Sequence, residues 1–407
     1  MAVLRKKSGG GTGASGFGLT FKLAMMHEAA HQEDGESGPD PRFGPAIQVL
    51  ETAISQRAFP GCAFGVLAGG KVVLRGALGR FTYADDSPAV RPETIFDVAS
   101  ITKVIATTAM AMLLHQRGQL DIDMPLGEVL PGFVIGRPSG DRARHVKLRH
   151  LLAHSSGLPG VVQFFKAAHS PAKLFQSCLE LPLEAEPGTR AEYSDPGFIL
   201  LGKALEVIAG ESLAKWSHRE IYVPLGMSAS RFRPVPHSLA SIPPTEDDTT
   251  WRHRVIQGEV QDENAAVLHG VAGHAGLFSN VPDLLRFAAE ILRAESELGG
   301  TETGTKLAQA GTTFFDRATV EMFAERQLPE GSSRALGWDT PSENSTSGRH
   351  FSPRSIGHLG FSGCSLWIDR EAHIVVNLLT NRTWPDRSSR MIREVWPVFH
   401  DAIREAL

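Results

Sequence analysis

The chain has 407 residues, is 42% hydrophobic and carries a formal net charge of −4, with 41 basic and 45 acidic residues. This length predicts about two or three structural units that share a sizeable buried core. The longest basic run is the three residues from Arg5 to Lys7, so neither a nucleic acid nor an anionic membrane surface is an expected partner. No stretch reaches the about 20 apolar residues that a transmembrane helix needs. The cysteines are few, odd in number and far apart, which predicts small core residues rather than disulfides, at Cys62, Cys178 and Cys364.

Residues 1–44 combine a Gly/Ser-rich segment with a charged, Gly/Pro-rich one, and we expect a flexible lead-in before a hydrolase domain over residues 45–407. The Gly-rich segment occupies the place where a signal peptide needs its apolar stretch. We therefore expect a cytoplasmic protein, or a periplasmic one if the start site is misassigned. His27, Glu28 and His31 match the spacing of zinc proteases, but they lie in this lead-in. A zinc metalloprotease stays a remote alternative, and we expect neither a metal nor a cofactor.

The remaining elements follow from periodicity and from turn residues. A helix is expected over about 45–57, and a hairpin with a Gly-Gly turn over 62–79. This hairpin contains the spacing of a phosphate loop, but Val72 stands where that loop needs Ser or Thr. Residues 101–114 are apolar at almost every position, which predicts a helix buried on all sides.

Further along the chain, helical runs are predicted near 148–154, 172–180, 197–209 and 282–294, a long loop over 299–355, a second hairpin over 363–380 and a closing helix over about 386–405. Hairpins at both ends predict one antiparallel sheet built from both ends of the chain. The expected fold class is α/β of the α+β type, an antiparallel sheet flanked by helices with a mostly helical second lobe. The sheet lobe is expected over about 45–118 and 340–407, and the helical lobe over about 119–339.

The spacing Ser-x-x-Lys occurs three times, at Ser100/Lys103, Ser170/Lys173 and Ser212/Lys215. On a helix this spacing brings the hydroxyl and the amine to the same face, so that the amine can take the serine proton. Ser170 precedes a proline like a helix N-cap, and Ser212 lies in an amphipathic surface pattern. Lys103 is the only charge between Asp97 and His115. We expect burial to make this amine neutral, and we expect the helix start at Ser100 to stabilise an oxyanion.

Five segments stand in an order that resembles the serine β-lactamase and penicillin-binding-protein family: FDVASITK, LRHLLAHSSGLPG, EPGTRAEYSDPGFILLGKALEVIAG, PLGM and GHLGFSG. The resemblance covers about residues 45–405 and is to the class C-like branch, which includes carboxylesterases, D-aminopeptidases and cell-wall esterases. It implies a β-lactamase/transpeptidase-like fold. It also implies that Ser100 is the acylated nucleophile, Lys103 its activating neighbour and Tyr193 the second proton carrier.

Two positions depart from the motifs of this family. Asp195 stands where asparagine is usual, and His358-Leu359-Gly360 replaces Lys-Thr-Gly. The resemblance implies an oxyanion hole from the backbone N–H groups of Ser100 and Phe361. An ordinary histidine is mostly neutral above pH 7, so we expect neutral short esters to be better substrates than β-lactams, and carboxylate substrates to gain as the pH falls.

Two other segments bear on the site. Tyr83-Ala84-Asp85 repeats the tripeptide spacing before the serine, and we expect Tyr83 to be a turn or edge residue. Residues 261–279 resemble esterases and cell-wall hydrolases, and their polar residues are expected either in the cleft or in loop packing: Asp262, Glu263, Asn264 and His274.

The function that the residues and the resemblance imply is a serine hydrolase that acts through an acyl-enzyme on Ser100. It would cleave a short ester, a β-lactam, a D-amino-acid peptide or a muropeptide-type substrate. The alternative is a penicillin-binding sensor that is acylated without turnover. The expected partner is a small-molecule ester or amide or a peptidoglycan-derived substrate. Nothing in the sequence indicates an oligomeric state.

Overall fold

The computed structural model describes residues 40–235, 240–295, 313–343 and 345–407. Contacts divide the chain between Gly38 and Pro39, and the description below concerns the second unit. The zinc-protease spacing at His27, Glu28 and His31 therefore lies outside the described residues.

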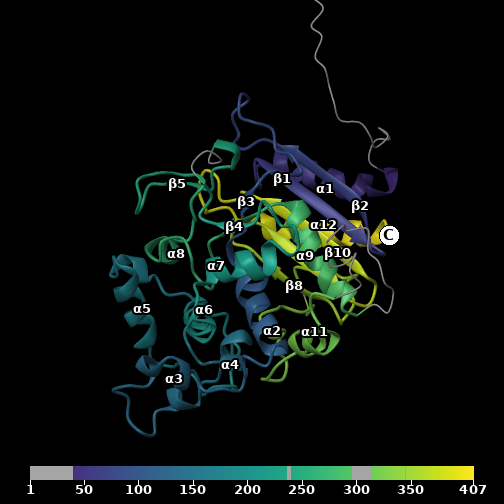
Figure 1. Cartoon of the computed structure of the whole chain (residues 1–407). Coiled ribbons are helices and arrows are strands. Elements are labelled where there is room, and N and C mark those ends of the chain that lie inside the picture. Colours follow the sequence, from purple (N-terminus) through teal and green to yellow (C-terminus); the bar gives the residue numbers. More distant parts are fainter. Residues whose placement is uncertain (1–39, 236–239, 296–312, 344) are drawn as a thin grey trace, which may run out of the picture. The chain divides into compact units, whose positions relative to one another are not determined.

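A five-stranded antiparallel sheet combines strands from both ends of the sequence (Figure 1), as predicted. Its strands follow in the order β2 (Lys71–Gly79), β1 (Gly61–Ala68), β10 (Ile374–Thr380), β9 (Ser365–Asp369) and β8 (Ile356–Leu359). The β1–β2 turn contains Gly69 and Gly70 with φ of 55° and 81°, a conformation that glycine adopts readily.

Helices cover both faces of this sheet. Side chains alternate along each strand, so both faces present apolar residues that helices can bury. Phe64 and Val66 point into a core with α1 (Gly44–Ser55) and α12 (Ile392–Glu405), which pack against each other. Gly65 faces the opposite way, where a β-carbon would lie 2.5 Å from Val281 of α9 (Val281–Arg293). The closing helix that the sequence predicted from about residue 386 is α12, which begins six residues later, at Ile392.

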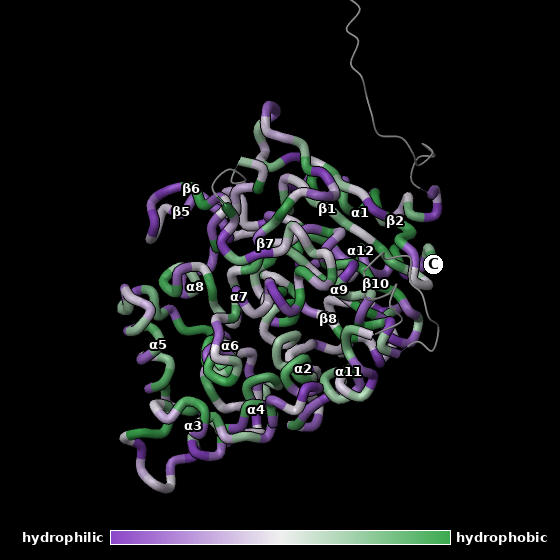
Figure 2. Tube along the Cα trace, viewed as in Figure 1, coloured by the Kyte–Doolittle hydropathy of each residue, from purple (hydrophilic) through white to green (hydrophobic). Residues whose placement is uncertain are grey.

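The helix that starts at the candidate serine lies in a second hydrophobic core, which also contains the buried residues of α9. A 3₁₀ turn over Ala99–Ile101 leads into a π-helical turn over Lys103–Thr108 and then into α2 (Ala109–Gln116). Every residue from 101 to 114 is buried, so the prediction of a helix enclosed on all sides is confirmed. Among its neighbours is α6, along which hydrophobic residues gather in Figure 2.

The other helices of the described chain are α3 (Leu126–Val129), α4 (Leu148–Leu152), α5 (Pro171–Leu179), α6 (Asp195–Ala209), α7 (Leu213–Ser217), α8 (Glu263–Val267) and α11 (Arg317–Ala324). Short 3₁₀ or π turns cover Pro41–Phe43, Pro131–Phe133, Arg142–His145, Phe164–Lys166 and His218–Tyr222. Helix α11 lies where a long loop was predicted, and that part of the prediction was wrong. Its eight residues are few for a periodic signal, but Asp316 caps it by accepting a hydrogen bond from Thr319 N (2.6 Å), and Phe323 is buried.

Two small sheets complete the unit. In the first, β7 (Leu277–Ser279) lies between β3 (Phe96–Asp97) and β4 (Arg231–Phe232), and in the second β5 (Glu246–Asp248) pairs with β6 (Arg254–Ile256). All three cysteines are buried and unpaired, as predicted. None of the helices in the described ranges combines the length and the apolar character that crossing a membrane requires.

Candidate active site

Ser100 lies in a tight turn that connects β3 to the buried helix. Ala99, just before it, has φ of 47°, a conformation that costs a non-glycine residue energy. The turn is stabilised by the N–H of Ala99, which donates to the buried carboxylate of Asp97 (2.9 Å). Ser100 is partly exposed although the residues on either side of it are buried. The turn therefore presents the hydroxyl at the surface of an otherwise closed core.

Lys103 is completely buried, and its ammonium group has three acceptors within reach. Nζ donates to Ser100 Oγ at 3.0 Å, to Asp195 Oδ1 at 2.7 Å and to the carbonyl oxygen of His274 at 3.2 Å. Burial by itself lowers the pKa of Lys103, but the carboxylate of Asp195 and the hydroxyl of Tyr193 outweigh it, so the pKa is raised. The expectation of a neutral amine was wrong, because the sequence did not show that Asp195 would lie beside it.

Tyr193 precedes α6, and its hydroxyl interacts with Lys103 and Ser100. Burial raises the pKa of the phenol more than the charge of Lys103 lowers it. Lys103 Nζ also lies 4.8 Å from the centre of the ring. The start of α6 is held by Ser194, whose Oγ accepts from Gly197 N at 3.0 Å. Tyr193 and Asp195 flank the capping residue Ser194 in the sequence, and both interact with Lys103.

His154 supports this arrangement, and sequence reasoning did not single it out. Its ring centre lies 4.6 Å from that of Tyr193, and its Nδ1 accepts from Ser194 N at 2.9 Å. Burial lowers its pKa well below 6.5, so the ring is neutral. His154 lies within LLAHSSGLPG, part of a segment on which the family resemblance rests. A histidine in that segment does not by itself indicate a contact with Tyr193, 39 positions later in the chain.

The turn after β8 packs against the backbone that leads to Ser100. A β-carbon on Gly360 would lie 2.5 Å from the carbonyl oxygen of Val98, and Ser362 Oγ donates to Asp97 O at 2.7 Å. Phe361 lies between these two contacts, and its half-exposed ring stacks on Arg382, whose Cζ is 4.3 Å from the ring centre. The structure therefore brings the segment with Phe361 alongside the turn that carries Ser100.

His358 belongs to β8 but is only 3% exposed, and its Nδ1 lies 2.8 Å from Leu359 O. Burial and the charge of Lys103 lower its pKa well below 6.5. Its imidazole thus stays neutral between pH 6 and 8. The expectation that it becomes partly charged in that range was wrong, because the side chain is enclosed rather than solvated.

The segment from 261 to 279 divides between the site and loop packing. Asp262 Oδ1 lies 2.9 Å from His274 Nε2, while the carbonyl oxygen of the same histidine accepts from Lys103. Burial opposes ionisation of Asp262, but His274 and the N–H of Ala265 hold its pKa at about 2. Asn264 instead bonds to the backbone of the loop before α5, and Glu263 pairs with Arg387 at 2.9 Å.

The competing serines and the competing tyrosine lie elsewhere. Ser170 caps α5, as predicted, by accepting from the backbone N of Lys173 at 3.3 Å. Ser212 is exposed at the start of α7. Tyr83 lies in a turn, where its hydroxyl donates to Arg57 O at 2.9 Å. The hydrogen-bond partners of Lys103 Nζ are instead Ser100, Asp195 and His274.

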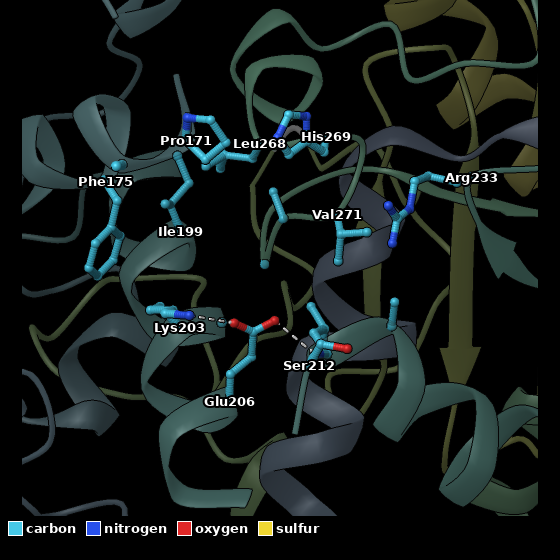
Figure 3. Close-up of a pocket in the computed structure, with 16 residues that line it drawn as sticks. Pro171, Phe175, Ile199, Lys203, Glu206, Ser212, Arg233, Leu268, His269 and Val271 are labelled. Atoms are coloured by element: carbon cyan, nitrogen blue, oxygen red, sulfur yellow. Dashed lines mark hydrogen bonds and ion pairs between the residues drawn. The ribbon is translucent and has the colours of Figure 1, made fainter. Parts of the chain in front are cut away.

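A cavity of about 400 Å³ lies between α5, α6, α7 and the loop after α8 (Figure 3), and Ser100 is not part of its lining. Apolar side chains such as Ile199 and Val271 face the Lys203–Glu206 ion pair across it. Its wall from Leu268 to Gly273 continues directly into His274. Within the described ranges, no group of three His, Cys, Asp or Glu residues is arranged to hold a metal ion.

Comparisons with known proteins show the family and the fold of the chain. The family model described as Beta-lactamase matches residues 46–396. The chain is 29% identical to "N-acetylmuramyl-L-alanine amidase" of Bacillus subtilis over 82% of this chain and 80% of that protein. It is 30% identical to "Putative D-alanyl-D-alanine carboxypeptidase" of Salmonella typhi over 80% of this chain and 79% of that protein. Among solved structures, "EstCE1, a hydrolase with promiscuous acyltransferase activity" is similar in fold, with a TM-score of 0.69 at 21% identity over 89% of this chain and 98% of that one. The chain therefore belongs to the beta-lactamase family and has the mixed α/β fold of its hydrolases.

Proposed function

We propose that this protein is a serine hydrolase that cleaves an ester or amide bond through an acyl-enzyme on Ser100. The observation that carries the proposal is the position of Lys103 Nζ, which bridges Ser100 Oγ at 3.0 Å and Asp195 Oδ1 at 2.7 Å. A serine hydroxyl needs a proton acceptor to become a nucleophile, and a raised lysine pKa makes the lysine alone a poor one.

A relay through Lys103 removes this difficulty. As Ser100 Oγ attacks the substrate carbonyl, its proton passes to Lys103 Nζ, while Lys103 passes another proton to the carboxylate of Asp195. The ammonium charge is thereby kept in its buried site. Tyr193, whose hydroxyl interacts with both Ser100 and Lys103, then donates a proton to the leaving group and regains one from the relay. Attack of water on the acyl-enzyme runs through the same groups in reverse and restores Ser100.

The negative charge that develops on the carbonyl oxygen needs donors. We assign this role to the backbone N–H groups of Ser100 and Phe361, since the contact of Gly360 with Val98 holds these two segments together. The names of two relatives indicate cell-wall peptides. We therefore propose an amide or ester of an amino acid as the substrate of this chain.

Intact-protein mass spectrometry after treatment with a fluorophosphonate tests the nucleophile. We expect one adduct, mapped to the peptide that contains Ser100 and absent from Ser100→Ala. Ser170→Ala and Ser212→Ala serve as controls and should keep it. An adduct on either control serine would refute the assignment. A penicillin adduct that persists for hours, with no hydrolysis of any ester, would instead identify a sensor.

A further inference from the structure

The segment that carries Tyr193 is bound to the loop that follows α4. The carbonyl oxygen of His154 accepts from Glu192 N at 2.8 Å, and the ring Nδ1 of the same histidine accepts from Ser194 N at 2.9 Å. Ser194 Oγ in turn donates to Pro159 O at 2.7 Å. His154 therefore binds the residues immediately before and after Tyr193, one with its backbone and the other with its side chain.

The ring of His154 also packs on the phenol. The two ring centres lie 4.6 Å apart with the planes tilted by 36°, and the imidazole lies 4.9 Å from the ring centre of Phe198 on α6. The imidazole is thus enclosed between the tyrosine and the helix that begins two residues after it. Rotation of the phenol toward α4 is blocked by this ring.

The other neighbours of the phenol contact its ring without holding its backbone. Lys103 Nζ lies 4.8 Å from the ring centre, and the ring of His358 lies 6.0 Å away. Arg334 Cζ lies 5.2 Å from it and belongs to a short hairpin that pairs with Gly357 of β8. In the described chain these three side chains make no hydrogen bond to the backbone of residues 192–194, whereas His154 makes two.

The backbone of His154 adopts an uncommon conformation. Its φ of 55° lies in the left-handed region, which histidine and asparagine enter more often than most residues other than glycine. The side chain is only 3% exposed. A residue that is held in this conformation while its carbonyl oxygen and its ring both bind the tyrosine segment is fixed in place at some energetic cost.

The protonation of the imidazole excludes a direct part in proton transfer. Since Nδ1 accepts the N–H of Ser194, the single proton of the neutral ring lies on Nε2, which has no hydrogen-bond partner within the described ranges. The charged and titratable groups that face His154 are Lys103, Arg334, His358 and Tyr193. The ring stays neutral between pH 6 and 8, so it can affect the reaction only through Tyr193.

We propose that His154 is a positioning residue, which holds the hydroxyl of Tyr193 beside Ser100 and Lys103 by binding the backbone on both sides of the tyrosine and by packing against its ring. The inference rests on the proposed function and deepens it, because it says what keeps the second proton carrier in place. A reacting group that is displaced by about 1 Å can cost about a hundredfold in rate. The effect of His154 on catalysis is therefore expected in kcat rather than in KM.

Two substitutions separate the hydrogen bond from the ring. His154→Phe keeps a ring beside Tyr193 but removes the acceptor, whereas His154→Asn keeps an acceptor for Ser194 N and adopts a left-handed backbone readily. His150→Phe is the matched control. His150 lies in α4, and its Nδ1 likewise accepts a backbone N–H, that of Lys147 at 3.1 Å, but its ring is not among the neighbours of Tyr193 in the described chain.

Hydrolysis of phenyl acetate is measured from pH 6 to 8 for the full chain and for the three variants. We expect His154→Phe to lose about a hundredfold in kcat with KM within about threefold, and His154→Asn to lose no more than about tenfold. The loss should be the same at every pH, because the ring does not titrate in this range. His150→Phe should be as active as the unmodified chain.

Nuclear magnetic resonance of the tyrosines shows whether the phenol has moved. The chain has three tyrosines, Tyr83, Tyr193 and Tyr222, so a protein labelled with ¹³C-tyrosine gives three sets of ring signals, which Tyr→Phe variants assign. We expect His154→Phe to shift the signal of Tyr193 and to leave those of Tyr83 and Tyr222 in place. His150→Phe should leave all three unchanged.

Four results would overturn the proposal. The first is a loss of kcat in His154→Phe while the signal of Tyr193 stays in place, and the second is a shift of all three tyrosines, which would mean that His154 only stabilises the fold. The third is a His154→Asn protein that is no more active than His154→Phe, because the bond to Ser194 N would then contribute nothing. The fourth is a loss that changes with pH, which would make His154 an acid or a base.

The Ser100→Ala protein keeps the two proposals apart. If it hydrolyses phenyl acetate like the unmodified chain, or if the unmodified chain does not hydrolyse this ester, the proposed function fails. His154 is then judged from the tyrosine signals, which do not depend on catalysis. A shift confined to Tyr193 in His154→Phe, and smaller in His154→Asn, supports the positioning role, and an unmoved Tyr193 signal refutes it.

Discussion

Asp195 Oδ1 lies 2.7 Å from Lys103 Nζ, closer to the ammonium than the hydroxyl of Ser100 at 3.0 Å. The lysine is therefore bound to a carboxylate and to the candidate nucleophile at the same time. This relationship makes Asp195 more than a substitute for the asparagine of the family pattern. It raises the pKa of Lys103. In the mechanism that we propose, it is also the final acceptor of the proton of Ser100.

The first prediction concerns Asp195→Asn. Without the carboxylate, the relay has no final acceptor, and burial then lowers the pKa of Lys103. We expect acylation at pH 7 to slow by about a hundredfold, the order of a general-base contribution, and the remaining activity to rest on a neutral lysine. The rate of fluorophosphonate labelling measures this. Glu192→Gln, which changes an exposed carboxylate three positions earlier, is the control, and an unchanged rate in Asp195→Asn would mean that the relay ends elsewhere.

The second prediction concerns Gly360→Ala. The added β-carbon would meet the carbonyl oxygen of Val98 at 2.5 Å, so the turn after β8 has to move away from the nucleophile turn. We expect at least about a hundredfold loss of kcat, since one oxyanion donor contributes that much. Gly140→Ala, where the β-carbon meets nothing within 4 Å, should be as active as the unmodified chain. Full activity of Gly360→Ala would remove Phe361 N–H from the oxyanion site.

The third prediction concerns Asp97. Burial raises its pKa to about 6, although the N–H groups of Gln261 and Ala99 oppose the rise. The ionised carboxylate accepts from both, at 2.8 and 2.9 Å, and its protonation removes the negative charge that strengthens these two hydrogen bonds. We expect kcat/KM to fall as the pH drops through about 6, and Asp97→Asn to have a lower but flatter profile there. An acid limb unchanged in Asp97→Asn would assign that titration to another group.

The same carboxyl group predicts a stability effect with a defined sign. The pKa in the folded state lies above the value of 3.8 expected for the unfolded chain, so the folded protein binds the proton more tightly. The contribution of Asp97 to the free energy of unfolding is greatest below pH 4 and falls by about 3 kcal/mol as the pH rises to 6. Urea denaturation between pH 4 and 7 should show this slope, relative to Asp97→Asn. No difference in slope between the two proteins would contradict it.

The fourth prediction concerns the first unit of the chain. The contacts divide after Gly38, and all the residues of the candidate site lie beyond it. We expect a protein that lacks residues 1–38 to hydrolyse esters at the rate of the full chain, with or without a zinc chelator. Loss of activity together with loss of bound zinc would point to His27, Glu28 and His31. The unmodified chain treated with the same chelator is the control.

Much of the fold could be predicted because its signals are local. The Gly-Gly turn between two strand-like runs predicted the first hairpin, and the unbroken apolar run predicted the enclosed helix at 101–114. The short helix α11 was missed because its eight residues hold few turns of periodic pattern, and its stability comes from Phe323 in the core and from the Asp316 cap.

The sequence by itself determined which residue types the site contains: a serine and a lysine one turn apart, and a Tyr-Ser-Asp tripeptide before a helix. Only the tertiary structure decided their protonation, because a pKa depends on which charges and how much solvent surround a group. Asp195 keeps Lys103 charged from 92 residues away, whereas enclosure keeps His358 neutral. The position of Arg334 over Tyr193 was likewise beyond sequence reasoning, since it depends on the pairing of a distant hairpin with Gly357 at the sheet edge. The sequence gives the chemical groups, but their pKa values and charges depend on neighbours and burial, which only the folded chain defines.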